Sequence, residues 1–271
     1  MGIHQQMGQR MTDDLGAGGL RFERDGSIGW CTIDRPAARN AFTPAMYFGL
    51  KRAVQLVNTD PDLAALIITG TGDVFAPGGD LGGRAEPGDN LPEGLGNDVL
   101  PFLAIRDSRA PVISAVNGIC QGGGLLVAMM SDIAIASDRA VFRVPELLRG
   151  IPDAFYAAML PAHVGVAVAR DLMLSARRFD AAEALRLGVI TRVSPHDDLR
   201  GAALTAAREV LRTAPQARAH VKRMLNERYG LIDTQTMFGS LATSQELREG
   251  MRAFMEKREP SWVPADVPSA I

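Results

Sequence analysis

The sequence is short of cysteine and has no excess of charge of either sign. Cys31 and Cys120 are the only cysteines among 271 residues and form no CxxC pair, which argues against a disulfide scaffold and a cysteine-bound zinc site. The 29 Lys and Arg residues are balanced by 31 Asp and Glu residues, so no basic surplus exists for binding nucleic acid. We therefore predict a protein without a bound metal and without a nucleic-acid partner.

Long apolar segments are missing as well. No uninterrupted apolar run approaches the ~18 residues of a membrane-spanning helix. The N-terminal stretch MGIHQQMGQRMTDD is polar and lacks the apolar segment of a signal peptide. These absences predict a cytoplasmic protein without a membrane partner, in which residues 1–18 form a loose tail.

The sequence does contain a mixture of strand and helix patterns. Asp25-Gly26 predicts a hairpin turn between two strand-like segments. Thr43-Pro44 predicts the capped start of a helix that runs to about Val57. Beyond Pro195 the pattern is almost entirely helical, over 197–213, 216–228 and 233–257. We expect an α/β core followed by a helical region.

The segment from Pro111 to Asp132 predicts a strand, a glycine turn and an apolar helix that begins near Gly123. Three consecutive glycines, 122–124, let the backbone approach a ligand closely. The first helical turn leaves N–H groups unpaired, and the helix dipole adds positive potential there. The turn therefore suits an anion, or an oxygen that becomes anionic during a reaction.

A second glycine loop, PGGDL at residues 77–81, also follows a strand-like segment. Neither loop has the Gly-Lys-Ser/Thr of a P-loop, and the triple glycine does not match the G-x-G-x-x-G spacing of a dinucleotide-binding fold. Each loop alone is typical of a tight turn. Together with a later carboxylate, Glu146, the two loops indicate a site that polarises an oxygen atom.

In these loops and their surroundings the chain resembles the enoyl-CoA hydratase/isomerase (crotonase) family, from about Phe22 to Trp262. The resemblance is carried, in order, by DRPAARNAFTPAM, FAPGGDL, AVNGICQGGGLLVAMMSDIAIAS, VPELLRGIPDA, MLSARRFDAAEALRLGVITRV and FMEKREPSW. It implies an α/β fold with a spiral of ββα repeats over residues 19–195. It also implies a C-terminal helical region, residues 196–271, through which family members assemble as trimers or pairs of trimers.

The resemblance further implies an enzyme that acts on an acyl-coenzyme A thioester, with no cofactor besides the coenzyme A of its substrate. By motif position, the backbone N–H groups of Gly79 and Gly123 would hold the thioester oxygen. Contacts to the coenzyme map to a set of loop residues, namely Ala37, Ala38, Arg39, Pro77 and Leu81, with Arg39 as a phosphate partner.

The acidic positions bear on the reaction. Hydratases of the family usually carry two glutamates; the second matches Glu146, and the first falls on Leu126, which cannot exchange a proton. Isomerases that shift a double bond from the 3 to the 2 position pair an apolar residue with a single glutamate, as Leu126 and Glu146 do here. The resemblance thus implies isomerisation, with Glu146 carrying the proton and Leu126 in the substrate site.

Alternatives stay open. Asp153 is either the N-cap of a helix that begins at Ala154 or a second catalytic acid. With Asp153, or a loop acid such as Glu86 or Glu93, as the second carboxylate, the enzyme would be a hydratase. A protein that binds acyl-coenzyme A without transforming it is the remaining possibility. Glu146 itself could be a solvated loop acid, or a salt-bridge partner of Arg143 or Arg149.

Overall fold

The structure is a computed structural model that describes residues 12–83, 86–93, 100–227, 239 and 243–261. Within them the strands are β1 Thr12–Asp13, β2 Leu20–Asp25, β3 Ile28–Ile33, β4 Ala65–Gly70, β5 Val74–Ala76, β6 Val112–Val116, β7 Ile119–Gln121, β8 Ile133–Ser137, β9 Val141–Arg143, β10 Phe179–Asp180 and β11 Arg192–Ser194. The α-helices are α1 Pro44–Thr59, α2 Phe102–Arg106, α3 Gly123–Met130, α4 Ala154–Val164, α5 Val166–Ser175, α6 Ala181–Leu187, α7 Leu199–Leu211, α8 Pro215–Asn226 and α10 Gln245–Glu256. The 3-10 helices are η1 Pro36–Ala38, η2 Glu146–Arg149 and η3 His196–Asp198.

Two β-sheets occupy the centre of the described chain. The larger sheet has seven strands in the order β1-β2-β3-β4-β6-β8-β11, and the smaller has four in the order β10-β9-β7-β5. In the larger sheet, neighbouring strands from β3 to β11 are parallel, whereas β1, β2 and β3 are joined antiparallel. In the smaller sheet β5, β7 and β9 are parallel, and β10 is antiparallel to β9.

The chain alternates between these two sheets. β4 lies in the larger sheet and β5 in the smaller, and the pairs β6–β7 and β8–β9 repeat this division. A helix follows each pair, namely α2, α3 and α4. This repetition is the ββα spiral that the resemblance implies, so the α/β fold class is confirmed.

Helix α1 forms where the sequence predicts it. The Thr43 hydroxyl accepts a hydrogen bond from the Met46 N–H at 3.1 Å, and Pro44 occupies the first turn, where its missing N–H leaves no bond unmade. Met46, Leu50 and Val54 recur about once per helical turn and are buried in the main core. Phe42, just before the helix, and Tyr47, near its start, both contact the glycine loop that contains Gly79.

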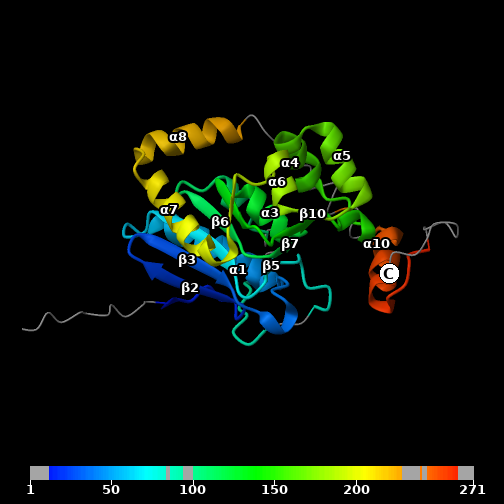
Figure 1. The fold of residues 1–271 in the computed structure, drawn as a ribbon. Helices are drawn as coiled ribbons and strands as arrows, with labels where there is room; N and C mark the ends of the chain where they lie inside the picture. The colour runs from blue at the N-terminus through cyan, green and yellow to red at the C-terminus, as the bar shows by residue number, and fades with distance from the viewer. Residues whose placement is uncertain (1–11, 84–85, 94–99, 228–238, 240–242, 262–271) are drawn as a thin grey trace, which may run out of the picture.

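Apolar side chains are buried on both faces of the larger sheet. The main core includes α1, α3 and α4, and on the other face Trp30 and Ile67 pack with Ala203 and Ala207 of α7. Figure 1 shows α7 lying along the strands, α8 continuing beyond it, and α10 at the far side of the molecule. The sequence-based division assigns residues 196–271 to a separate helical region, yet α7 in that region packs on the larger sheet. The division itself stays a prediction.

The expectation of a loose tail over residues 1–18 is wrong for its described part. Thr12 and Asp13 form β1 and pair with β2, and the Arg24 guanidinium contacts the Asp13 carboxylate at 2.9 Å. Leu15 and Ala17 are buried. The polar composition of the segment does not show that Leu15 and Ala17 pack into the main core.

The C-terminal helices agree with the sequence pattern to within a few residues. The first predicted helix is η3 followed by α7, and the second is α8. The predicted helix over 233–257 falls partly outside the described residues, and its described part is α10. None of the described helices combines the length and the apolar character needed to cross a membrane.

Candidate active site

A cavity of about 280 Å³ lies where both glycine loops meet. Its walls come from the loop after β5, the turn before α3, the 3-10 helix η2 and the helix α10. The lining residues are Ala41, Pro77, Gly78, Gly79, Asp80, Leu81, Gly82, Gly122, Gly123, Pro145, Glu146, Arg149, Ile151 and Phe254. The structure therefore brings the two predicted donors and the predicted acid into one cavity.

The first predicted donor, Gly79, sits in a loop that is anchored by Phe42. The Phe42 N–H donates to the Gly78 carbonyl at 2.9 Å, and the Asp80 N–H donates to the Phe42 carbonyl at 2.8 Å. These two hydrogen bonds do not use the Gly79 N–H, which has no acceptor among the described residues. A ligand in the cavity can therefore take it as a hydrogen-bond donor.

The second predicted donor, Gly123, is the first residue of α3. Gly122 precedes it with a φ of +52°, a backbone conformation that favours glycine, and the Tyr156 hydroxyl holds the Gly122 carbonyl at 2.7 Å. The Gly123 N–H has no acceptor among the described residues, as expected in a first helical turn. A Cβ on Gly78 would lie only 3.5 Å from the Gly123 nitrogen, so the two loops touch each other.

Glu146 places a carboxylate beside these donors. Its side chain is buried, with 8 % exposed, and its Oε2 has no hydrogen-bond partner among the described residues. Its Oε1 lies 3.0 Å from where a Cβ on Gly122 would be, so only glycine fits there comfortably. Burial, with a smaller contribution from the negative charge of Asp153, raises the pKa of Glu146 to about 8. Such a group can take up and release a proton near neutral pH.

The charged neighbours of Glu146 act in opposite directions. The Arg149 guanidinium lowers the pKa of Glu146, although no ion pair joins the two side chains within the described part of the chain. Arg149 instead donates to the Pro145 carbonyl at 3.2 Å, and Arg143 donates to the Ala176 carbonyl. Glu146 is therefore neither solvated nor tied up in a salt bridge within the described chain.

Asp153 caps α4, as one of its two predicted roles required. Its Oδ1 accepts the Tyr156 N–H at 3.0 Å, and burial raises the pKa of its carboxyl group. It does not line the 280 Å³ cavity, but it lies near enough for its charge to act on Glu146. The cap and the electrostatic influence on Glu146 coexist.

The helix α10 closes one side of the cavity. The Phe254 side chain lines it and lies beneath the Arg149 guanidinium, at 4.9 Å from the ring centre. A Cβ on Gly250 would approach the Arg149 backbone to 2.7 Å, so a glycine is needed for this contact.

The remaining predicted residues divide between the cavity and its surroundings. Pro77 and Leu81 line it. Ala37, Ala38 and Arg39 lie in and after η1, next to the lining residue Ala41, and the Arg39 side chain is exposed. Leu126 lies on α3 but is buried in the main core, with 1 % exposed, and does not line the cavity.

The loop acids considered as a second carboxylate lie elsewhere. Glu86 pairs with the buried guanidinium of Arg35, which also holds Asp80 at 2.7 Å, and Glu93 is exposed. Neither lines the cavity. Arg35 thus stabilises the loop of the first donor, a role that sequence reasoning missed.

Sequence reasoning considered Arg149 only as a salt-bridge partner of Glu146, and it missed Tyr47, Tyr156 and Phe254. These three come from distant segments, and no local pattern connects them with the glycine loops.

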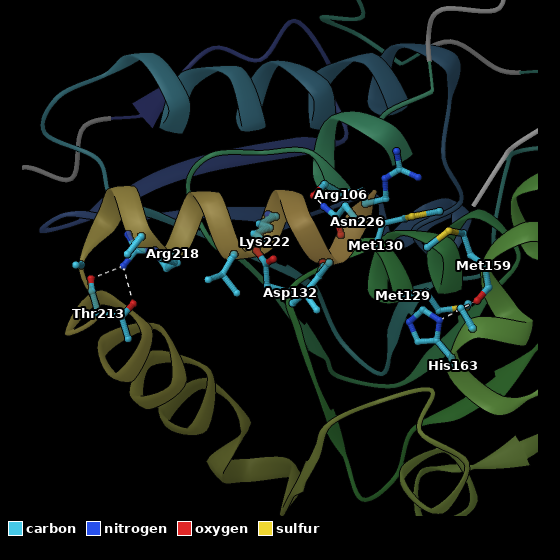
Figure 2. Close-up of a pocket in the computed structure, with 16 residues that line it drawn as sticks. Arg106, Met129, Met130, Asp132, Met159, His163, Thr213, Arg218, Lys222 and Asn226 are labelled. Carbon is cyan, nitrogen blue, oxygen red and sulfur yellow. Dashed lines mark hydrogen bonds and ion pairs between the residues drawn. The ribbon is translucent and has the colours of Figure 1, made fainter. Parts of the chain in front are cut away.

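A second cavity of about 740 Å³ lies between α8 and the ends of α3 and α4 (Figure 2). Three methionines, Met129, Met130 and Met159, line one part of it, and Lys222 of α8 pairs with Asp132 at 2.7 Å. It shares no lining residue with the smaller cavity and contains neither glycine loop. Although the second cavity is the larger of the two, the predicted site residues line the smaller one.

Comparisons with known proteins agree with this arrangement. A family model described as enoyl-CoA hydratase/isomerase matches residues 23–264. The chain is 34% identical to a probable mitochondrial enoyl-CoA hydratase of Dictyostelium discoideum, over 89% of each chain. It is 36% identical to a carnitinyl-CoA dehydratase of Salmonella arizonae, over 90% of this chain and 97% of that protein. A crystal structure of an enoyl-CoA hydratase/isomerase from Pseudoalteromonas atlantica superposes with a TM-score of 0.80 at 32% identity. The match covers 90% of this chain and 100% of that chain.

Two glycine loops and a buried glutamate thus surround one cavity in a chain that is similar to an enoyl-CoA hydratase and to a carnitinyl-CoA dehydratase. The chain belongs to the enoyl-CoA hydratase/isomerase (crotonase) family of enzymes.

Proposed function

We propose that this enzyme converts 3-enoyl to 2-enoyl thioesters of coenzyme A. The thioester oxygen accepts hydrogen bonds from the Gly79 and Gly123 N–H groups, and Glu146 moves a proton from C2 to C4. The observation that carries this proposal is the buried carboxylate of Glu146 in one cavity with the Gly79 and Gly123 N–H groups. Among the described residues, neither the Oε2 of Glu146 nor either N–H group has a hydrogen-bond partner. Leu126, at the position of the other hydratase glutamate, provides no second acid.

The proton transfer can be written in two steps. The Glu146 carboxylate takes a proton from C2, and the electrons of the broken C–H bond move toward the thioester oxygen, giving a dienolate. The protonated Glu146 then donates to C4, which leaves the double bond between C2 and C3. Donors already aimed at the developing oxyanion contribute about 3–4 kcal/mol each in other enzymes.

A pKa of about 8 for Glu146 suits both steps. A stronger acid would be a poor base toward C2, and a weaker acid would return its proton to C4 too slowly. Burial of the carboxylate therefore serves the reaction, although it disfavours the ionised form in the free enzyme.

Coenzyme A would extend from the cavity along the loops around η1 and the segment after β5. Ala37, Ala38, Pro77 and Leu81 are proposed to contact it through the backbone, and the exposed Arg39 side chain is placed to meet a phosphate. No further cofactor is proposed, because the dienolate is stabilised by the protein alone.

Hydration of a 2-enoyl thioester is the second candidate. The relatives given above are named hydratase or dehydratase, and the Asp153 carboxylate is close enough to raise the pKa of Glu146. In that reaction Asp153 would have to give up its hydrogen bond to the Tyr156 N–H, or share it, in order to hold water.

One assay separates these functions. The absorbance of the conjugated 2-enoyl thioester is followed with 3-enoyl and with 2-enoyl substrates, for the wild type, Glu146→Gln and Asp153→Asn. Appearance of the signal from 3-enoyl substrate, abolished in Glu146→Gln and retained in Asp153→Asn, supports isomerisation. Loss of the signal from 2-enoyl substrate, dependent on Asp153, would favour hydration, and tight binding without turnover would leave a binding protein.

We also propose a homotrimer, or a pair of trimers, located in the cytoplasm. Val221, Leu225 and Phe254 of the C-terminal helices are each more than half exposed in the single chain, at 55%, 57% and 51%. Large apolar side chains are costly to leave in water, and contacts between subunits would cover them on both helices. Light scattering of the purified protein tests the assembly; a monomer at micromolar concentration would contradict it.

A further inference from the structure

Tyr47 places a phenol hydroxyl against both donor glycines, and the proposed proton transfer leaves it without a role. A Cβ built on Gly123 would lie 2.1 Å from the Tyr47 Oη, and one on Gly79 would lie 3.6 Å from it. The hydroxyl therefore occupies the space that a side chain on Gly123 would need. It comes from α1, an element that the two glycine loops do not include.

The ring of Tyr47 is held in this position. It contacts Phe42 at 4.8 Å between ring centres and Phe102, edge-on, at 5.9 Å. Phe42 is the same residue that anchors the Gly79 loop, so the hydroxyl and the first donor share one support. The hydroxyl thus has a fixed place relative to both N–H groups.

The Tyr47 hydroxyl has no hydrogen-bond partner among the described residues. The other tyrosine of the site, Tyr156, does have one, since it holds the Gly122 carbonyl at 2.7 Å. The Tyr47 hydroxyl adjoins Gly79 and Gly123, which line the 280 Å³ cavity, so a ligand atom held between those glycines can serve as its partner.

The charge state decides what this hydroxyl can do. Burial and the negative charges of Glu146 and Asp153 raise the pKa of Tyr47, so the phenol stays protonated. A protonated phenol donates a hydrogen bond and does not act as a base. It can therefore give its proton in a hydrogen bond to an acceptor such as a thioester oxygen.

We propose that the Tyr47 hydroxyl is a third hydrogen-bond donor to the thioester oxygen, beside the N–H groups of Gly79 and Gly123. This inference rests on the proposed function, because it uses the same bound oxygen. The two N–H groups come from the glycine loops, and the phenol hydroxyl reaches the same place from α1. As negative charge develops on the oxygen, a third donor stabilises the dienolate more than the neutral thioester.

The test uses the enolate itself and does not depend on which reaction is catalysed. A 3-oxoacyl thioester of coenzyme A ionises at C2, and its enolate absorbs in the near ultraviolet. The apparent pKa of the bound compound is measured by titration with the wild type and with Tyr47→Phe, which keeps the ring and removes only the hydroxyl. Phe48→Leu, at the next residue of α1, serves as the control, since the Phe48 ring contacts Arg52, whereas the Tyr47 hydroxyl adjoins Gly79 and Gly123.

We expect Tyr47→Phe to weaken enolate binding by roughly 10- to 100-fold, which raises the apparent pKa of the bound compound by about one to two units. Binding of a saturated acyl thioester should change by less than about threefold, and kcat should fall while KM stays nearly constant. Phe48→Leu should match the wild type in all three measurements.

Two results would overturn the inference in distinguishable ways. If the wild type lowers the pKa of the bound compound and Tyr47→Phe lowers it equally, Tyr47 is not a donor and the two-glycine site stands. If the wild type itself does not lower that pKa, the oxyanion site fails and the inference fails with it.

Discussion

Phe42 pairs with Gly79 in an isolated parallel bridge, and its two hydrogen bonds go to the residues on either side of that glycine. The Gly78 carbonyl and the Asp80 N–H are thereby used, while the Gly79 N–H between them stays available. A loop that has no regular structure of its own is thus oriented by one strand-like residue from another segment. Preorganisation of this kind is what makes a backbone donor effective in catalysis.

Tight packing around the second glycine loop should appear as a stability difference between two matched substitutions. A Cβ on Gly124 would meet the Ala76 carbonyl oxygen at 2.3 Å, whereas a Cβ on Gly79 finds its nearest atom at 3.6 Å. We expect Gly124→Ala to lower the free energy of unfolding by about 1–3 kcal/mol, because the backbone must shift, and Gly79→Ala to leave it nearly unchanged. Urea unfolding measures both. Equal stability of the two variants would contradict the packing described here.

The rate should depend on the ionisation of Glu146. Since the carboxylate must be ionised to take the C2 proton and its pKa is about 8, we expect kcat/KM to level off above pH 8. Below that pH it should fall about tenfold for each pH unit. A flat profile between pH 6 and about 9 would show that another group acts as the base.

The midpoint of that profile should move in opposite directions in two variants. Arg149→Met removes a positive charge that favours the ionised form of Glu146, so the midpoint should rise. Asp153→Asn removes a negative charge that disfavours it, so the midpoint should fall, and asparagine retains the helix cap. The same pH–rate titration measures both variants. A common direction of movement would mean that the two charges do not act on Glu146.

The ionised form of Glu146 should destabilise the folded protein at alkaline pH. Its pKa is raised from 4.5 to about 8, so between these values the folded state holds a proton that the unfolded state has lost. The contribution of this group therefore falls as pH rises from 4.5 to 8, by up to roughly 5 kcal/mol for the full shift. We expect Glu146→Gln to match the wild type near pH 4 and to be more stable above pH 8, as measured by urea unfolding across this range. A constant difference at every pH would contradict the burial of an ionisable group here.

Much of the fold follows from local patterns. Thr43-Pro44 caps the helix predicted for it, because a side-chain oxygen and a proline act on residues within one turn. The α8 boundaries are nearly those of its helical pattern. Leu15 and Ala17 were missed because their burial depends on the α1 surface they cover, which no nearby residue encodes.

The family, the two glycine turns and the single Glu146 could be predicted without a structure, since each depends on residue types at fixed spacing along the chain. The folded chain was needed to find Tyr47 and Phe254 at this site, and to find Leu126 in the core instead of the cavity. These positions depend on how α1, η2 and α10, which are far apart in the sequence, pack around the two glycine loops. Burial and charge, which raise the pKa of Glu146, exist only once that packing has formed.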